Sequence, residues 1–250
     1  MCTVTWVHDD DGYQLFFNRD EKRTRKPATS PQLSVRDGVR FLAPVDGDFG
    51  GSWIGVNELA VSVCLLNGAK LTRSKLQQAT PGQLESLKSR GLVLLDLIAA
   101  PSVAAACERL CRTDLSAFEP FTIAALEPGQ PVSLVEWNGA EKTIVPCGES
   151  YLPLTSSSFD AEGARTKRQD EYLRVLNPSG QLNANLLFAF HQSHGPGPSA
   201  YSPCMHRADA ETVSFSWIRV TDSEVDFFYT PAALCKCSPG ESKKLARRFH

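Results

Sequence analysis

The chain opens on an alternation of apolar and polar positions that is typical of a β-hairpin. Residues 3–7 read Thr-Val-Thr-Trp-Val, and residues 13–17 form a second β-rich run with three aromatic side chains. Between them, residues 8–12 read His-Asp-Asp-Asp-Gly, and Asp-Gly is a strong turn signal. The hairpin is expected to bring the end of the second run, residues 18–21, next to residue 2.

The remaining pattern predicts strands and helices in mixed order. Apolar and β-branched runs predict strands on either side of a turn within 50–67, and over 121–126, 132–137, 143–145, 213–220 and 225–229. Helical periodicity predicts helices over 84–99, 101–110 and 167–176, and 186–191 is expected to form a short helix or strand.

Two stretches lack such periodicity. Residues 20–50 are polar and contain Pro and Gly, which predicts a long loop that could roof a pocket. The basic stretch 242–250 is expected to be helical or frayed. The mixture of many strands with a few helices favours an α+β or layered α/β class, and the length of 250 residues allows one domain over residues 1–250.

Composition and charge exclude several classes of function. Hydrophobic residues make up 42%, charged residues 22%, and the net charge is −2, so the chain lacks the basic excess of a nucleic-acid-binding protein. It has no apolar run long enough for a transmembrane helix, and its start has no basic-then-apolar signal pattern. We therefore expect a cytoplasmic protein without nucleic-acid partners, and the oligomeric state stays open.

Cys2 is the first candidate for chemistry. If Met1 is removed, one residue carries both a thiol and a free α-amine, whose reference pKa values are about 8.5 and about 8. The amine can then accept the thiol proton, which makes Cys2 nucleophile and base together. The hairpin would bring Arg19, which lowers a neighbouring thiol pKa, and Asp20, which could hold the ammonium. The alternative is that residues 18–21 are only the charged end of a strand that leads into the polar loop 22–26. In that case, Cys2 follows Met1 only because a small second residue eases the removal of Met1.

The hairpin and a second motif together resemble a known family. Met-Cys, about fifteen residues of hairpin and then Asn-Arg-Asp-Glu is the pattern of the NRDE family, also called the transport and Golgi organisation protein 2 family. Residues 50–56 (Gly-Gly-Ser-Trp-Ile-Gly-Val) resemble the family's Gly-Gly-Thr-Trp-Leu-Gly element, and residues 89–93 resemble its later Arg-Gly element. The resemblance is strong over residues 2–100 and patchy afterwards.

This family is similar in turn to N-terminal-nucleophile hydrolases of the bile-salt hydrolase and penicillin V acylase group. The resemblance implies a four-layer α-β-β-α sandwich and cleavage of non-peptide amide bonds. It implies that Cys2 is the nucleophile, that Arg19 stabilises the thiolate and that Asp20 positions the amine. Asn67 stands where the acylases have an oxyanion donor, although from the residues alone, Asn67 before Gly68 is equally well a turn residue.

The same comparison suggests residues that bind substrate. Asn18 brings an amide to the end of the hairpin, and Ser156 stands at the position of a second acylase asparagine. Serine is a shorter donor, and a polar Ser-rich turn is the alternative. The late arginine of the acylases corresponds to Arg207, or with a small shift to His206. His191 and His194 are kept as solvated loop residues.

The eight cysteines are expected to be reduced thiols, mostly buried. Cys204, His206, Cys235 and Cys237 could in principle form a zinc site, but their Cys-x-His and Cys-x-Cys spacings do not fit the usual structural-zinc patterns. We therefore expect no metal and no cofactor.

Three functions remain open from the sequence. The first is an amidohydrolase that cleaves a C–N bond of a small acylated substrate through a Cys2 thioester. The second is a carrier on the same fold for haem or a lipid-like ligand, roles that are discussed for the family. The third is an interaction protein with a vestigial site, in which Cys2, Arg19 and Asp20 could all be replaced without effect.

Overall fold

The computed structural model describes residues 2–68, 87–147, 149–176 and 182–249. Thirteen strands in this part of the chain form two antiparallel sheets. Hydrogen-bonded neighbours in the six-stranded sheet follow the order β10-β1-β2-β11-β12-β13. These strands are β1 (Cys2–Asp9), β2 (Gly12–Lys22), β10 (Leu154–Ser156), β11 (Ala210–Val220), β12 (Glu224–Thr230) and β13 (Glu241–Ala246).

The seven-stranded sheet runs in sequence order from β3 to β9. Its strands are β3 (Thr29–Arg36), β4 (Val39–Val45), β5 (Ile54–Asn57), β6 (Ser62–Asn67), β7 (Phe121–Leu126), β8 (Val132–Trp137) and β9 (Lys142–Cys147). Each of these strands pairs with the next, although residues 68–120 separate β6 from β7.

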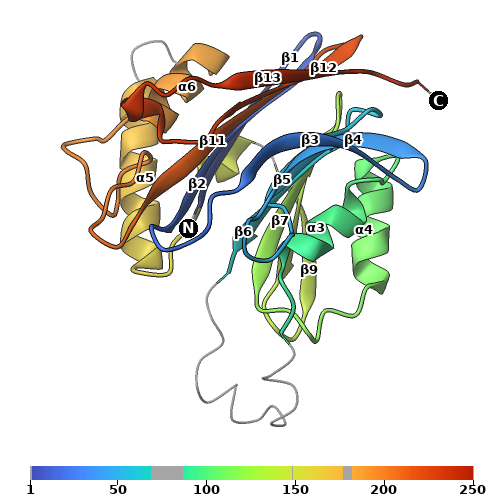
Figure 1. The fold of residues 1–250 in the computed structure, drawn as a ribbon, viewed down its shortest axis with the longest axis horizontal. Coiled ribbons are helices and arrows are strands. Elements are labelled where there is room, and N and C mark those ends of the chain that lie inside the picture. Colours follow the sequence, from blue (N-terminus) through green and yellow to red (C-terminus); the bar gives the residue numbers. More distant parts are fainter. Residues whose placement is uncertain (1, 69–86, 148, 177–181, 250) are drawn as a thin grey trace.

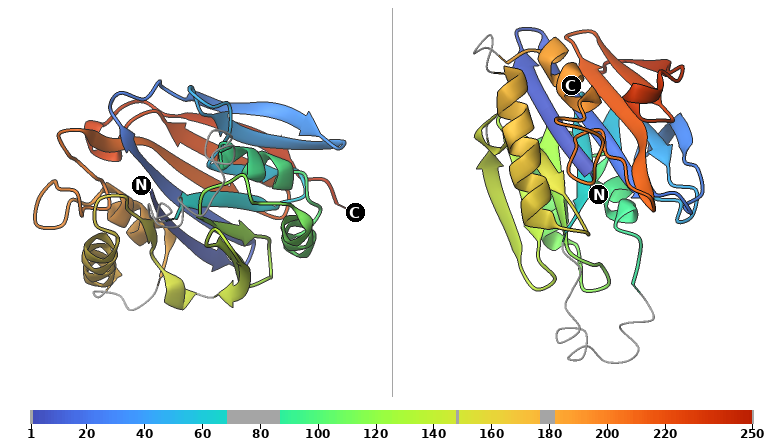
Figure 2. Two further views of the ribbon diagram at one scale, coloured as in Figure 1. Left: turned by 90° about the horizontal axis from the view of Figure 1, so that it is seen from below. Right: turned by 90° about the vertical axis from the view of Figure 1, so that its left-hand side faces the viewer.

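Helices cover the outer face of each sheet (Figure 1). The helices α5 (Ala161–Leu176) and α6 (Ala184–Gln192) lie on the six-stranded sheet, and α3 (Gly91–Leu97) and α4 (Val103–Arg112) lie on the seven-stranded sheet. Two single-turn helices, η1 (Glu149–Tyr151) and η2 (Leu234–Lys236), complete the described elements. Figure 2 shows the resulting α-β-β-α layers from two further sides, which confirms the expected sandwich.

The larger core lies between the two sheets. Alternation along β1 and β2 sends Val4, Trp6, Leu15 and Phe17 into it, all completely buried. A second core lies between the seven-stranded sheet and α3 and α4, and it contains Phe121. Because each sheet is covered on both faces, nearly all residues of the central strands β1, β2, β5 and β6 are buried.

The six-stranded sheet is linked to the seven-stranded sheet by a buried carboxylate. Glu58, only 1% exposed, accepts hydrogen bonds from the Arg40 side chain in β4 at 2.5 Å and forms an ion pair with Arg248, after β13, at 2.9 Å. These guanidiniums outweigh the effect of burial, so the pKa of Glu58 lies below its usual value.

Three sequence-based expectations about elements were wrong. Residues 29–45 form a paired hairpin and not a loop, because β4 finds a partner in β5 as well as in β3. Residues 241–246 form the edge strand β13 and not a helix, because β12 offers an unpaired edge to a sequence without strong periodicity. The described part of the helix predicted over 84–99 is helical only from Gly91 to Leu97.

No helix among the described residues is both long and apolar enough to cross a membrane.

Candidate active site

The first two strands place Cys2 beside Arg19, as the hairpin predicts. Cys2 lies opposite Arg19 of β2 and, on its other side, opposite Ser156 of β10. Directly paired residues share a face of a sheet, so all three side chains belong to the face that looks toward the seven-stranded sheet. Within the described part of the chain, the Ser156 Oγ is buried without a hydrogen-bond partner. A buried hydroxyl of this kind is available to a bound molecule next to the thiol.

Arg19 is held by two residues of the opposite sheet. Its guanidinium lies 4.0 Å from the centre of the Trp53 ring and forms an ion pair with Asp46. Asp46 also binds Arg25 at 2.7 Å and accepts the backbone N–H groups of Asp48 and Phe49. Burial acts to raise the pKa of Asp46, but the Phe49 N–H and the two guanidiniums lower it overall. Asp46 therefore stays ionised and fixes the position of Arg19.

Asp20 points to the other face of the six-stranded sheet, toward α5. There it forms a buried ion pair with Arg168 at 3.0 Å and accepts a hydrogen bond from the Thr212 hydroxyl at 2.7 Å. Arg168 also donates to the backbone oxygen of Cys2 at 3.2 Å and to the Thr3 hydroxyl at 2.6 Å. One buried guanidinium thus joins Asp20 to the backbone of Cys2.

Burial dominates the acidity of the Cys2 thiol. It raises the thiol pKa above the ordinary value, and the carboxylates of Asp20 and Glu21 act in the same direction. The charges of the amino terminus and of Arg19 lower the pKa but do not outweigh burial. The thiol is therefore held neutral at rest, which is the state in which a nucleophile needs a nearby base.

A third arginine, Arg90, lies at the start of α3, in the helix layer of the seven-stranded sheet. Arg90 precedes α3, donates to the backbone oxygen of Pro120 at 3.0 Å and pairs with Glu119 at 3.5 Å. Partial burial lowers the pKa of Arg90, while the charges of Glu119, Cys2 and Glu21 act in the opposite sense. The charges of Cys2 and Glu21 thus act on Arg90, whose own contacts are with Pro120 and Glu119.

Two glycines bring that arginine into place. A Cβ on Gly91 would lie 2.7 Å from backbone atoms of Ser52, and a Cβ on Gly51 would lie 2.8 Å from backbone atoms of Gly91. The Ser52 N–H donates to the Gly91 oxygen at 3.2 Å. The Gly-Gly-Ser-Trp element therefore has two uses, since it lets α3 approach and it supplies Trp53 under Arg19.

A cavity of about 390 Å³ lies on the Arg19 side of the site. Arg19 and Glu21 form part of its wall together with the basic stretch 22–26, and Glu211, Thr212 and Lys236 form the opposite part. Its size is within the range of small-molecule sites. Arginine and lysine predominate among its charged side chains, which favours a ligand with an anionic or strongly polar end.

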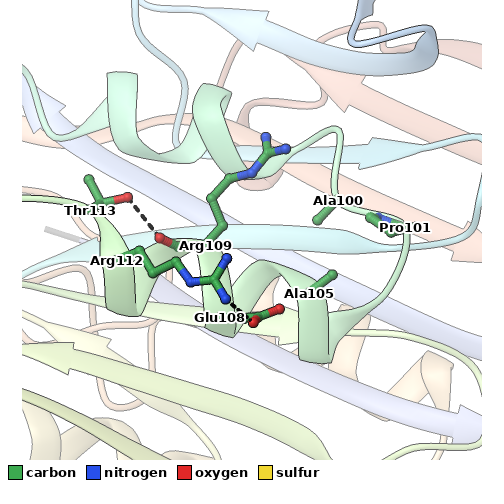
Figure 3. A pocket seen from close by; sticks show the side chains of 7 residues that line it. All are labelled: Ala100, Pro101, Ala105, Glu108, Arg109, Arg112 and Thr113. Atoms are coloured by element: carbon green, nitrogen blue, oxygen red, sulfur yellow. Dashed lines mark hydrogen bonds and ion pairs between the residues drawn. The ribbon is translucent and has the colours of Figure 1, made fainter.

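A second hollow, of about 400 Å³, lies far from these residues on α4 (Figure 3). Its wall includes Glu108, Arg109 and Arg112, and the Arg112 and Glu108 side chains form an ion pair across one turn of the helix. None of the predicted site residues lines it. We do not connect this hollow with the chemistry of Cys2.

Asn67 is the last residue of β6 and lies opposite Phe121. In β6, Cys64 and Leu66 belong to the core between the sheets, whereas Leu65 and Phe121 belong to the core under α3 and α4. Alternation therefore assigns the Asn67 side chain to the helix side. Its backbone N–H points to the same edge as that of Leu65, which donates to the Trp53 oxygen.

The other predicted substrate ligands have partners away from Cys2. Both amide hydrogens of Asn18 are donated at 2.8 Å, to the backbone oxygens of His191 and Pro203, on the α6 side of the sheet. Arg207 pairs with Asp209 at 2.8 Å and stacks on Phe159. His206 contacts other histidine and cysteine side chains, which are described below.

His191 is not a solvated loop residue. It lies in α6 and is completely buried, where its Nε2 is 2.9 Å from the Thr5 hydroxyl and its ring stacks on Phe16. Burial, with a smaller effect of the Arg168 charge, lowers the pKa of His191 to about 3. The apolar residues of α6 around it predicted this burial better than the Gly/Pro-rich segment that follows.

Sequence reasoning missed Asp46, Arg90 and Arg168. Asp46 lies in the stretch that was expected to be a loop. Arg168 lies on a helix with little amphipathic pattern, where a buried arginine cannot be told from an exposed one. The signal for Arg168 was the Asp20 carboxylate at the end of a largely apolar strand, because a buried carboxylate requires a cation close by.

The comparisons with known proteins concern the family and the fold. The sequence profile of the Transport and Golgi organisation 2 family matches residues 1–189. The chain belongs to this family. A search of curated proteins found no match.

Solved structures with a similar fold include an acid amidase, a bile acid hydrolase and an acylase. An N-acylethanolamine-hydrolyzing acid amidase orthologue from Caenorhabditis elegans is 12% identical with a TM-score of 0.61, and the match covers 87% of this chain and 92% of that one. A C2A mutant of the conjugated bile acid hydrolase from Clostridium perfringens is 10% identical with a TM-score of 0.58, covering 100% and 97%. Penicillin V acylase from Agrobacterium tumefaciens is 10% identical with a TM-score of 0.56, covering 93% and 83%. At these identities the likeness shows the fold alone.

Proposed function

We propose that the protein is an N-terminal-cysteine amidohydrolase that cleaves a non-peptide C–N bond of a small acylated substrate. The observation that carries the proposal is the pairing of Cys2 with Arg19 and Ser156 on the inner face of the sheet. Of these three residues, Arg19 also lines a cavity of ligand size. The names of the structural neighbours, which describe an acylase, an acid amidase and a bile acid hydrolase, support this class of reaction.

The reaction begins once Met1 has been removed. The Cys2 thiol gives its proton to the Cys2 α-amine while the sulfur attacks the carbonyl carbon of the substrate, forming a tetrahedral oxyanion. Collapse of this intermediate breaks the C–N bond, the α-ammonium returns the proton to the leaving amine, and a thioester remains. Water then attacks the thioester with the α-amine as base, which releases the carboxylic acid and restores the thiol.

Three groups support these steps. Arg19 offsets the charge of the thiolate, since its own position is fixed by Asp46 and Trp53. Asp20 holds the α-ammonium, and Arg168 keeps Asp20 and the Cys2 backbone in register. Asp20 and Arg168 are positioning residues rather than reacting groups.

Two further groups are proposed as donors to the substrate. The backbone N–H of Asn67 is a better oxyanion donor than its side chain, because the side chain belongs to the helix side of β6. The Ser156 hydroxyl, buried beside the thiol, donates to the substrate carbonyl or amide. A preorganised oxyanion donor contributes roughly 3–4 kcal/mol to catalysis.

The experiment combines mass spectrometry with turnover. Intact mass should show loss of Met1, and peptide mapping after treatment with iodoacetamide should show alkylation of Cys2 as well as of the exposed Cys111 and Cys237. A panel of fluorogenic N-acyl amides of increasing acyl length should reveal turnover that falls at least about 1,000-fold in Cys2→Ala, as expected for loss of a nucleophile. Cys111→Ser, at an exposed cysteine on α4, is the matched control and should keep full activity.

Retention of Met1 in the active protein, or full turnover by Cys2→Ala, would overturn the proposal. Tight haem binding by a protein that turns over none of these amides would instead favour the carrier function expected for some family members.

A further inference from the structure

Four metal-binding side chains converge behind the six-stranded sheet, away from the inner face that carries the Cys2 side chain. They are His194, Cys204, His206 and Cys235, and one ligand atom of each lies within 4.8 Å of those of the other three. His194 follows α6, Cys204 and His206 precede β11, and Cys235 lies in η2 after β12. The chain must fold completely to bring these segments together.

Four of the six distances between the ligand atoms match the edges of a tetrahedron around a metal ion, and the other two are below 4.8 Å. The two histidine Nε2 atoms are 3.2 Å apart, and the two Sγ atoms are 3.6 Å apart. The His206 Nε2 lies 3.6 Å from the Cys204 Sγ and 3.3 Å from the Cys235 Sγ. Zinc bonds of about 2.3 Å to sulfur and about 2.0 Å to nitrogen predict edges of about 3.3 Å between nitrogens, about 3.5 Å between nitrogen and sulfur, and about 3.8 Å between sulfurs.

We propose that these four residues form a structural Zn²⁺ site of the Cys₂His₂ type. Two thiolates and two imidazole nitrogens are the donor set that zinc prefers in proteins, and tetrahedral S₂N₂ geometry is diagnostic for it. Four protein ligands fill the coordination sphere, so the ion has no open position for substrate or water. Its role is therefore structural and separate from the chemistry proposed for Cys2.

A disulfide between the two cysteines explains the arrangement less well. The Cys204 and Cys235 sulfurs are 3.6 Å apart, against about 2.0 Å in a disulfide. A disulfide would also leave the two imidazoles without a reason to direct their Nε2 atoms at each other and at the sulfurs. A shared cation gives all four atoms one centre.

The ion would stabilise the segment that supports β2 from behind. Within the segment 193–209, the Pro203 oxygen accepts a hydrogen bond from Asn18, and the Met205 N–H donates to the Thr212 hydroxyl at 2.8 Å. Thr212 in turn donates to Asp20. Residues 193–209 form no helix and no named strand, and they are rich in Gly, Pro and Ser. A metal that joins this segment to η2 would therefore fix its conformation.

The spacing in the sequence concealed the site. The sequence offers Cys237 as the fourth ligand, and it predicts no metal because the Cys-x-Cys and Cys-x-His spacings do not match structural-zinc patterns. The fold uses His194 in place of Cys237, which is exposed.

The test is metal content of the full-length protein purified without added metal, measured by inductively coupled plasma mass spectrometry. We expect about one zinc per chain in the wild type, and after exchange with Co²⁺, the visible absorption of tetrahedral cobalt with thiolate ligands. Cys235→Ser and His194→Asn should each weaken zinc binding more than about 100-fold, because loss of even an outer-sphere partner costs about 10–100-fold. Cys237→Ser, two residues from a ligand, is the matched control and should keep its zinc.

Circular dichroism establishes which variants fold, and two independent ligand variants guard against the failure of one. A metal-free wild type that does not take up Zn²⁺ or Co²⁺, equal zinc in His194→Asn and wild type, or a Cys204–Cys235 disulfide in freshly purified protein would each overturn the site. Cys2→Ala should keep about one zinc, so this result is independent of the proposed hydrolase activity.

Discussion

At the scale of single residues, the buried guanidinium of Arg168 has the largest predicted effect on stability. Its side chain is completely buried and binds Asp20, Thr3 and the Cys2 backbone. Arg168→Met leaves the Asp20 carboxylate buried without its cation, which should lower the free energy of unfolding by about 3–5 kcal/mol. Urea denaturation measures this change, and Arg165→Met, at an exposed position of the same helix, should change it by less than about 0.5 kcal/mol.

Equal effects of the two substitutions would mean that Asp20 is satisfied without Arg168. The pair also shows why residue-scale prediction was incomplete. The register places Arg19 opposite Cys2, and Asp20 follows it along the strand. The sequence did not indicate that the Asp20 side chain points toward α5, because both faces of this sheet are buried and the pattern of the strand does not say which face the helices cover.

His191 makes stability depend on pH. Its pKa is about 3 in the folded protein against an ordinary value of 6.5, so below pH 6.5 the unfolded chain binds a proton that the folded one does not. Its contribution is therefore complete above pH 6.5 and is lost as the pH falls toward 3, by at most about 1.4 kcal/mol per pH unit. Urea unfolding at several pH values should show this slope, and His191→Gln should reduce it.

The His191 ring itself gives a second measurement. Its proton chemical shifts should stay constant from neutral pH to about 4.5, since a buried imidazole resists protonation. A midpoint near 6.5 in these shifts would contradict the burial that we describe.

At the scale of elements, the contact between Gly51 and Gly91 controls how closely α3 approaches the site. Gly91→Ala should be favourable by about 1 kcal/mol from helix propensity alone. The added Cβ, however, would lie 2.7 Å from the Ser52 backbone and would push α3 outward. We expect a net loss of about 1–3 kcal/mol in unfolding free energy.

Gly197→Ala is the matched control, because a Cβ there meets nothing within 4 Å. Thermal unfolding of both variants and of the wild type decides the question. A Gly91→Ala protein at least as stable as the wild type would show that α3 can move without cost.

Elements whose own sequence has a strong pattern could be predicted, whereas elements that form only because they pair with a neighbouring strand could not. The strands β7 and β8 match their predicted bounds, because apolar alternation and turn residues define both ends. The strand β13, Glu-Ser-Lys-Lys-Leu-Ala, has no such pattern and forms because it pairs with β12 along six residues. Its lysines suit an edge strand, since charge there discourages pairing with other chains.

At the scale of the whole molecule, the site depends on the two sheets staying together. Cys2, Arg19 and Ser156 come from one sheet, whereas Asp46, Trp53 and Arg90 come from the other sheet and its helix layer. The four-layer arrangement could be predicted only through the family resemblance, because periodicity predicts elements and not their stacking. The chemistry therefore requires a contact between layers that no local pattern encodes.

Glu58 tests how firmly the sheets are joined. Its buried carboxylate binds Arg40 from the seven-stranded sheet and Arg248 from the chain after β13. Glu58→Gln removes the charge but keeps the size, and we expect a loss of about 1–3 kcal/mol in unfolding free energy, since hydrogen bonds to charged groups contribute about that much.

Because the pKa of Glu58 is lowered in the folded protein, its contribution is complete above the ordinary value and is lost as the pH falls below it. The difference between wild type and Glu58→Gln should therefore shrink between pH 6 and about 3 in urea unfolding. Glu224→Gln, which removes an exposed ion pair with Lys244, is the control. A constant difference across this range would show that Glu58 acts through packing and not through its charge.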